Sequence, residues 1–123
     1  MDYKKHSLYI GRFQPFHDGH EWCVRKILQD GKRVCIAVMD IHSFEPENNP
    51  FPTQVVIDVI TVRFGSEIEA GEIVVLKIPP IESVNYTSDA DYNIVEHVPP
   101  ESIRKISATN IRQASKLSSK LKN

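Results

Sequence analysis

Apolar runs separated by glycines and prolines divide the first part of the chain into a strand, a helix and a second strand. A short apolar run at 7–10 is followed by a turn, and apolar residues then recur at helical spacing over 21–29. The segment 33–39 is apolar almost without interruption, which is typical of a strand buried on both faces of a parallel sheet. This order predicts a βαβ unit with a right-handed crossover.

Beyond this unit, the pattern predicts a loop, a crossover helix and a third strand. The segment 40–52 is polar and broken by prolines, so we expect a loop at the carboxyl edge of the sheet, where open α/β sheets bind ligands. The segment 54–64 is rich in β-branched residues, yet we expect a helix with Thr53 as its N-cap, because parallel strands need a crossover between them. The third strand is expected at 72–78.

The last third of the chain is less regular. Residues 79–91 are interpreted as a surface loop, a substrate loop or a short helical turn. Tyr86 and Tyr92 are either partly buried loop residues or stacking partners for a base or an acceptor ring. A fourth strand is expected at 93–98, and a final helix after Ser107 or Thr109. Together the elements predict an α/β fold: a Rossmann-like open parallel sheet of about four to five strands with helices on both faces, as a single domain over the whole chain.

Composition excludes several functional classes. The 123 residues carry 15 Lys and Arg against 16 Asp and Glu, a formal net charge of −1, so the basic surface of a nucleic-acid-binding protein is missing. No apolar run is long enough to span a membrane, and the first residues lack the apolar region of a signal peptide. Cys23 and Cys35 are expected to be buried and reduced. We therefore expect a cytoplasmic protein that binds neither nucleic acid nor membrane, with homo-oligomerisation left open.

Chemically distinctive residues gather in the turn between the first strand and the first helix. This turn reads Gly11-Arg12-Phe13-Gln14-Pro15-Phe16-His17-Asp18-Gly19-His20. Its glycines let the backbone bend and approach a ligand, and the free N–H groups of the first helical turn attract an anion. His17 and His20 are three residues apart, so both rings can lie on one side of that turn and donate hydrogen bonds to phosphate oxygens, with added charge if protonated. The turn is predicted to be a phosphate site.

Other interpretations of this turn are weaker. A zinc site needs further ligands, and no Cys or carboxylate lies at ligand spacing nearby, so we expect no metal held by the protein itself. Either histidine alone would usually be an ordinary core or surface residue. The glycine spacing matches neither the G-x-G-x-x-G of dinucleotide-binding folds nor the G-x-x-x-x-G-K-[ST] of P-loops.

Two motifs resemble the small nucleotidyltransferases of the cytidylyltransferase-like superfamily. The turn resembles their G-x-F-x-P-x-H-x-G-H signature, and its amino-acid sequence is most similar to that of the archaeal-type nicotinamide mononucleotide adenylyltransferases. About ninety residues further on, Ile106-Ser107-Ala108-Thr109-Asn110-Ile111-Arg112 resembles the family's I-S-x-T-x-I-R motif. The resemblance implies an enzyme that transfers a nucleoside monophosphate from ATP or CTP to a phosphorylated small-molecule acceptor, with release of pyrophosphate.

The same resemblance implies roles for individual residues. His17, His20 and Arg112 would be catalytic, with the histidines near the reacting phosphorus and Arg112 on the leaving phosphates. The residues implied to bind the nucleotide are Gly11, Arg12, Phe13, Gly19, Ile106, Ser107 and Thr109. Mg²⁺ would bridge the phosphate oxygens and be held largely by the nucleotide.

The motifs point to two different triphosphates. The wording of the turn and the segment Asn49-Pro50-Phe51 favour AMP transfer from ATP, although Val55-Val56 stands where the adenylyltransferases usually carry Glu-Arg. The short chain favours the CTP-dependent cytidylyltransferases, but their usual Arg-Thr-x-Gly is replaced by Ser102-Ile103-Arg104-Lys105. A nucleotide-binding module without catalysis is the alternative from another class. A fragment of an aminoacyl-tRNA synthetase ranks last, because the chain is too short and too acidic to hold tRNA.

Overall fold

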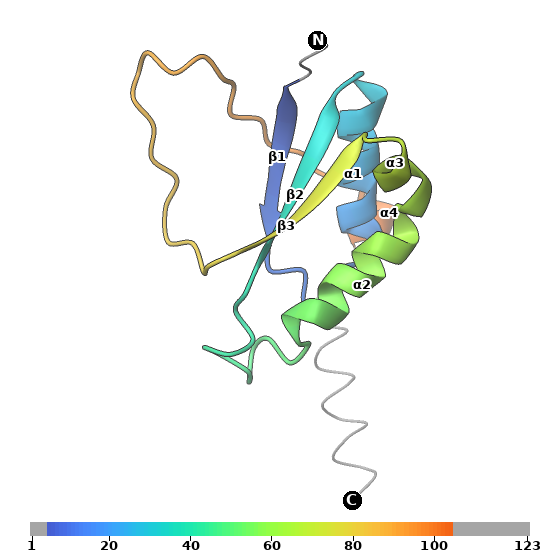
Figure 1. Cartoon of the computed structure of the whole chain (residues 1–123), viewed down its shortest axis with the longest axis vertical. Helices are drawn as coiled ribbons and strands as arrows, with labels where there is room; N and C mark the ends of the chain where they lie inside the picture. Colours follow the sequence, from blue (N-terminus) through green and yellow to red (C-terminus); the bar gives the residue numbers. More distant parts are fainter. Residues whose placement is uncertain (1–4, 105–123) are drawn as a thin grey trace, which may run out of the picture.

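A three-stranded parallel sheet is the frame of the molecule (Figure 1). The structure is a computed structural model and describes residues 5–104. The strands are β1 (His6–Gly11), β2 (Arg33–Met39) and β3 (Ile73–Ile78), which lie in this order across the sheet. All three strands expected from the first part of the sequence are therefore confirmed, each within one residue of its expected bounds.

Four helices accompany the sheet in this part of the chain. They are α1 (Asp18–Gln29), α2 (Thr53–Arg63), the five-residue α3 (Gly65–Glu69) and the four-residue α4 (Glu101–Arg104). The expected crossover helices correspond to α1 and α2, whereas α3 and α4 were not expected. None of the helices described is long and apolar enough to cross a membrane.

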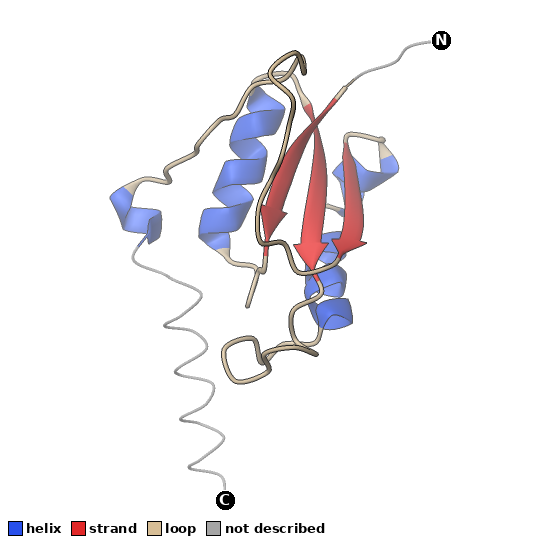
Figure 2. Cartoon of the chain, turned by 90° about the vertical axis from the view of Figure 1, so that its left-hand side faces the viewer, coloured by secondary structure: helices blue, strands red, loops and turns tan. Residues whose placement is uncertain are grey.

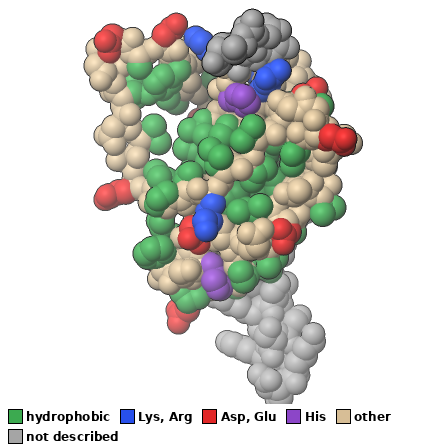
Figure 3. Space-filling model, viewed as in Figure 1, with side chains coloured by type: hydrophobic (Ala, Val, Ile, Leu, Met, Phe, Trp, Pro, Cys, Tyr) green, Lys and Arg blue, Asp and Glu red, His purple; other side chains and the backbone are tan. Residues whose placement is uncertain are grey.

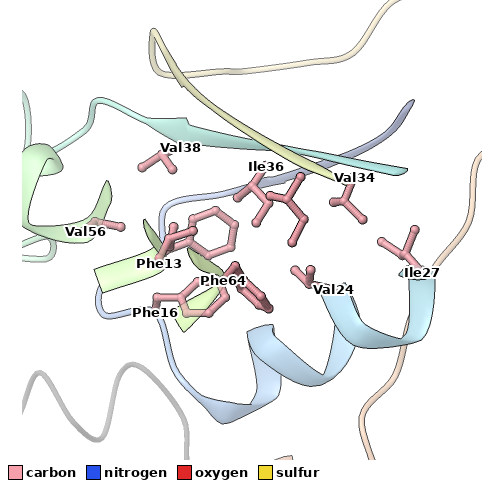
Figure 4. Close-up of a cluster of buried hydrophobic side chains, with 11 residues drawn as sticks. Phe13, Phe16, Val24, Ile27, Val34, Ile36, Val38, Val56 and Phe64 are labelled. Carbon is pink, nitrogen blue, oxygen red and sulfur yellow. The ribbon is translucent and has the colours of Figure 1, made fainter. Parts of the chain in front are cut away.

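The core lies between the sheet and α1, α2 and α3, all on one face (Figures 2 and 4). Val34, Ile36 and Val38 of β2 point into it and meet residues of both α1 and α2. Both crossovers step in the same direction across the sheet, and right-handed crossovers that do so place their helices on the same face. The expectation of helices on both faces was wrong for the residues described.

The expected fourth strand at 93–98 is not formed. Residues 79–100, called the arch below, are irregular and loop out on the side of the sheet away from the helices (Figures 1 and 2). A strand needs a neighbour for its backbone N–H and C=O groups, and the arch pairs with neither edge strand. The described part therefore has three strands instead of about four to five.

Two smaller expectations also need correction. Thr53 is the first residue of α2 and not its N-cap, because its hydroxyl donates instead to Oδ1 of Asp40 at 2.7 Å. Cys23 is buried as expected, but Cys35 is only partly buried because its side chain points away from the helices. The helix expected after Ser107 or Thr109 lies outside the described residues.

Candidate functional site

The turn between β1 and α1 is held in shape by aromatic packing. Phe13 has a φ of 52°, in the left-handed region that bulky residues rarely adopt. Its ring is 3% exposed and packs edge-on against Phe16 and His20, with centroids 5.3 and 4.9 Å apart. Gly11 leaves the room this requires, since a Cβ there would lie 2.6 Å from Cε1 of Phe13. The buried ring therefore holds the backbone in a conformation that is unfavourable by itself.

His17 and His20 form a reciprocal cap at the start of α1. His17 is the N-cap residue, and its Nδ1 accepts a hydrogen bond from the backbone N–H of Gly19 at 3.0 Å. The backbone N–H of His17 in turn donates to Nδ1 of His20 at 3.1 Å. The two rings stack with centroids 3.8 Å apart. The expectation that both imidazoles lie on one side of the first turn is confirmed.

This cap also determines which nitrogen of each ring carries the proton. Because both Nδ1 atoms accept from backbone N–H groups, the hydrogen of each neutral ring must be on Nε2. Neither Nε2 has a hydrogen-bond partner within residues 5–104. The turn therefore offers two N–H donors on stacked rings at the positive end of a helix, which is an arrangement suited to phosphate oxygens.

Both histidines are held in the neutral form. Burial, together with the nearby His17 and Arg63, lowers the pKa of His20 to about 3. Burial also lowers the pKa of His17, with Asp18 acting in the opposite direction. The rings therefore act as neutral donors at pH 7 before any ligand binds. An added proton is not needed for the phosphate site expected from the sequence.

These lowered pKa values make the fold sensitive to acid. The unfolded chain takes up protons on His17 and His20 as the pH falls below about 6.5, whereas the folded protein takes them up only at lower pH. The free energy of unfolding should thus be fully retained above pH 6.5 and decrease as the pH falls towards 3, by at most about 1.4 kcal/mol per pH unit for each group.

Urea unfolding between pH 7.5 and 4.5 measures this slope. The comparison variant is His20→Gln, which keeps an acceptor for the N–H of His17 but does not titrate. Its slope should be shallower than that of the original protein. An equal slope in both proteins would contradict the assignment of the acid sensitivity to His20.

Gly19 is required by the ring of His17. A Cβ at Gly19 would lie 2.8 Å from Cε1 and 3.1 Å from Nδ1 of His17, so Gly19→Ala must displace that ring from the cap. We expect kcat/KM for nucleotidyl transfer, the reaction that the motif resemblance implies, to fall at least about tenfold, because the donor on His17 would be displaced. The matched control is Gly65→Ala at the start of α3, where a Cβ meets nothing within 4 Å. Equal activity of the two variants would contradict this role of Gly19.

A buried amide joins the turn to the loop after β2. Gln14 is 1% exposed, and its side chain both donates to the backbone C=O of Phe51 and accepts from the backbone N–H of Phe51, each at 2.8 Å. Asn49 is fully buried, and its Oδ1 accepts from Arg12 at 3.4 Å, while its backbone C=O contacts Nδ1 of His42 at 2.7 Å. The segment Asn49-Pro50-Phe51 therefore anchors the turn. Sequence reasoning missed Gln14, since glutamines are common in surface turns.

The acidic residues of the first helical turn are neutralised from α2. Arg63 donates to Asp18 at 3.2 Å and to Glu21 at 3.1 Å, and its guanidinium lies over the ring of Phe16. Without this arginine, two carboxylates would repel an anion at the helix start. Among residues 5–104, no group of three His, Cys, Asp or Glu side chains is placed to hold a metal ion. Arg63 was not predicted, because only the fold brings it beside α1.

The residues predicted for the site divide into three groups. Gly11, Arg12, His17, Gly19 and His20 lie together at the end of β1 and the start of α1. Phe13 is also there, but its ring is in the core, so only its backbone is available to a nucleotide. The predicted residues Ile106, Ser107, Thr109 and Arg112 lie outside the described residues.

The end of the described chain nevertheless lies close to the histidines. α4 packs against α1, and Cγ2 of Ile103 is 3.7 Å from where a Cβ of Gly19 would be. Asp18, Glu21, Trp22, Arg25 and Ile103 line a shallow depression along this contact. In the sequence, the second motif begins three residues after Ile103.

Comparison with known proteins points to one group of enzymes. The chain is 38% identical over 47 residues to the nicotinamide-nucleotide adenylyltransferase of Methanolobus tindarius. This alignment covers 38% of the chain and 27% of that protein. The chain is also 31% identical over 79 residues to the enzyme of the same name from Caldivirga maquilingensis. This alignment covers 63% of the chain and 44% of that protein. The chain resembles the archaeal nicotinamide-nucleotide adenylyltransferases.

The resemblance inferred from the two motifs is therefore confirmed for part of the chain. A third adenylyltransferase, from Methanospirillum hungatei, is 36% identical over 45 residues, which is 37% of the chain and 26% of that enzyme. The matches thus span between about a quarter and less than half of the length of these adenylyltransferases. No family model matches the chain.

Proposed function

We propose that the chain is a nucleotidyltransferase domain that moves AMP from ATP to a phosphorylated small-molecule acceptor and releases pyrophosphate. The observation that carries the proposal is the stacked pair of His17 and His20 at the start of α1, with both Nδ1 atoms engaged by the backbone and both Nε2–H groups available. The partial similarity to adenylyltransferases supports the same reaction.

The reaction is an in-line displacement at the α-phosphorus of the triphosphate. An oxygen of the acceptor phosphate forms a new P–O bond as the bond to the pyrophosphate oxygen breaks, and the electron pair leaves with pyrophosphate. The protein needs no nucleophile of its own. The Nε2–H groups of His17 and His20 and the helix start stabilise the negative charge that moves onto the leaving group.

The second motif completes the site in this proposal. From Arg104, Ser107 is three residues away and Arg112 eight residues away, and a fully extended chain covers at most about 11 and 29 Å over these separations. Ser107, Thr109 and Arg112 then hold the β and γ phosphates, and Arg12 is a further donor on the turn. Mg²⁺ comes with the triphosphate, because Asp18 and Glu21 are already paired with Arg63.

Pyrophosphate release measured with ATP and with CTP, over a panel of phosphorylated acceptors that includes nicotinamide mononucleotide, tests the proposal. We expect release with ATP and at least one acceptor, with a much lower rate for CTP. A higher rate with CTP than with ATP would show that the reaction is cytidylyl transfer instead of adenylyl transfer. Binding of a triphosphate in calorimetry without product from any acceptor would overturn the catalytic function.

A further inference from the structure

The loop after β2 carries a histidine whose ring is oriented by the backbone. Nδ1 of His42 lies 2.7 Å from the backbone C=O of Asn49, and because a carbonyl oxygen can only accept, Nδ1 must carry a hydrogen. In the neutral ring the lone pair is then on Nε2, which has no hydrogen-bond partner within residues 5–104. His42 therefore offers an acceptor, whereas His17 and His20 offer donors.

Asn49 holds this ring beside the histidine turn. Asn49 is fully buried, with its backbone C=O on His42 and its Oδ1 accepting from Arg12 at 3.4 Å. The loop is also joined to the turn by the two hydrogen bonds between Gln14 and Phe51. His42 and Arg12 are thus bound to one residue at the carboxyl ends of the strands, which is the edge where parallel sheets bind ligands (Figure 2).

This part of the molecule is open to a ligand. His42 is only partly buried, and Arg12 is exposed. Charged and histidine side chains reach the surface below the apolar middle of the face in Figure 3, and the loop after β2 lies at this lower end in Figure 1. The two side chains are therefore available to a molecule that binds at the turn.

His42 and Arg12 differ in the groups they can bind. A guanidinium has only N–H donors, so Arg12 suits phosphate oxygens and keeps its place as a donor to the triphosphate. A neutral Nε2 would meet a phosphate oxygen with its lone pair, which is unfavourable, so it suits an O–H donor instead. Hydroxyl groups stand beside the phosphate in ribose phosphates and polyol phosphates. The pair therefore fits a ligand of this chemistry.

The direction of the reaction gives this hydroxyl to the acceptor. In the proposed function the pyrophosphate leaves at His17 and His20, and an in-line displacement brings the attacking phosphate from the opposite side. The loop contacts the turn at Arg12 and Gln14, before α1 begins. An acceptor that approaches away from the start of α1 therefore meets the loop.

We propose that His42 is a specificity-determining residue, whose Nε2 accepts a hydrogen bond from a hydroxyl group that the acceptor carries beside its phosphate. The inference rests on the proposed function, because it names the class of acceptor for that reaction. Sugar and polyol phosphates belong to this class, whereas alkyl phosphates without a hydroxyl leave Nε2 unpaired and bind less well.

Pairs of acceptors that differ only in hydroxyl groups test the proposal. Pyrophosphate release from ATP is measured with glycerol 3-phosphate against propyl phosphate, and with nicotinamide mononucleotide against its 2′,3′-dideoxy analogue. We expect kcat/KM to be at least about tenfold higher for the hydroxyl-bearing member of a pair that reacts. His42→Asn keeps an N–H donor for the C=O of Asn49 but has no atom in place of Nε2, so it should bring this ratio to about one.

Two comparisons separate this role from other effects of the substitution. A loss that is equal for both members of a pair would show that His42 only shapes the loop, which overturns the proposal. If His42→Asn instead removes discrimination between ATP and 2′-deoxy-ATP or 3′-deoxy-ATP, the hydroxyl belongs to the triphosphate, and the assignment to the acceptor is overturned. The matched control is His6→Asn at the other end of β1, which should leave every ratio unchanged.

Binding without turnover separates the inference from the proposed function. Calorimetry of the same acceptor pairs with α,β-methylene-ATP bound, from which no AMP is transferred, measures the affinity for the acceptor alone. Tighter binding of the hydroxyl-bearing member, lost in His42→Asn, supports the role of His42 even where no acceptor gives product. Product formation without any preference for a hydroxyl overturns the role of His42 and leaves the proposed function intact.

Discussion

His20→Ala is expected to lower kcat for pyrophosphate release on the order of 10²-fold, with a smaller effect on KM. The ring of His20 offers one of the two free Nε2–H groups and also stacks on His17, which offers the other. Its loss removes charge stabilisation that matters most in the transition state. Steady-state kinetics with ATP and the best acceptor measure the effect, and a variant with normal turnover would remove His20 from the mechanism.

His20→Ala removes both the helix cap and the imidazole, so a second variant is needed to tell their effects on kcat apart. His20→Gln keeps an acceptor that can reach the backbone N–H of His17, as the glutamine of an ordinary capping box does, but it has no imidazole. It should unfold at nearly the same urea concentration as the original protein and still have a much reduced kcat. His6→Ala, at the other end of β1, should leave kcat unchanged.

Phe64→Ala is expected to lower the free energy of unfolding by about 3–5 kcal/mol. Phe64 is fully buried at the junction of α2 and α3, where its ring packs edge-on against Phe16 at 5.9 Å and lies under the guanidinium of Arg25 at 5.0 Å. The substitution leaves a cavity that a rigid sheet on one side cannot fill. For a domain of this size the loss is a large fraction of the total stability.

Urea unfolding followed by far-UV circular dichroism measures this difference. The control is Val62→Ala, two residues earlier and 83% exposed, which should change the free energy by less than about 0.5 kcal/mol. Similar losses for both variants would show that Phe64 is not part of the cooperative core. Because Phe16 belongs to the turn before α1, Phe64→Ala should also reduce activity in the fraction that remains folded.

The parts of the fold that depend on neighbours in sequence were predictable. The apolar runs of β1, β2 and β3 and the glycine turn before α1 follow from local periodicity and backbone freedom, and the spacing of His17 and His20 was enough to place both rings together. Their proton positions follow from the cap geometry, which a sequence motif does not show.

The parts that depend on distant residues were not predictable. An apolar run such as β2 indicates burial on both faces, but it does not show that α1 and α2 both pack on the same face. The arch contains β-branched residues at 94 and 95 and still forms no strand, because no edge of the sheet reaches it. Arg63 and Gln14 meet their partners only across sequence separations of about forty residues, which no local pattern records.

The side-chain amide of Gln14 pairs with the backbone N–H and C=O of Phe51 as a neighbouring strand would in a β-sheet. These two hydrogen bonds join the histidine turn to the loop after β2, although 37 residues separate them in the sequence. If the turn binds the triphosphate as proposed, a displacement of the turn is transmitted to this loop through the two hydrogen bonds of Gln14.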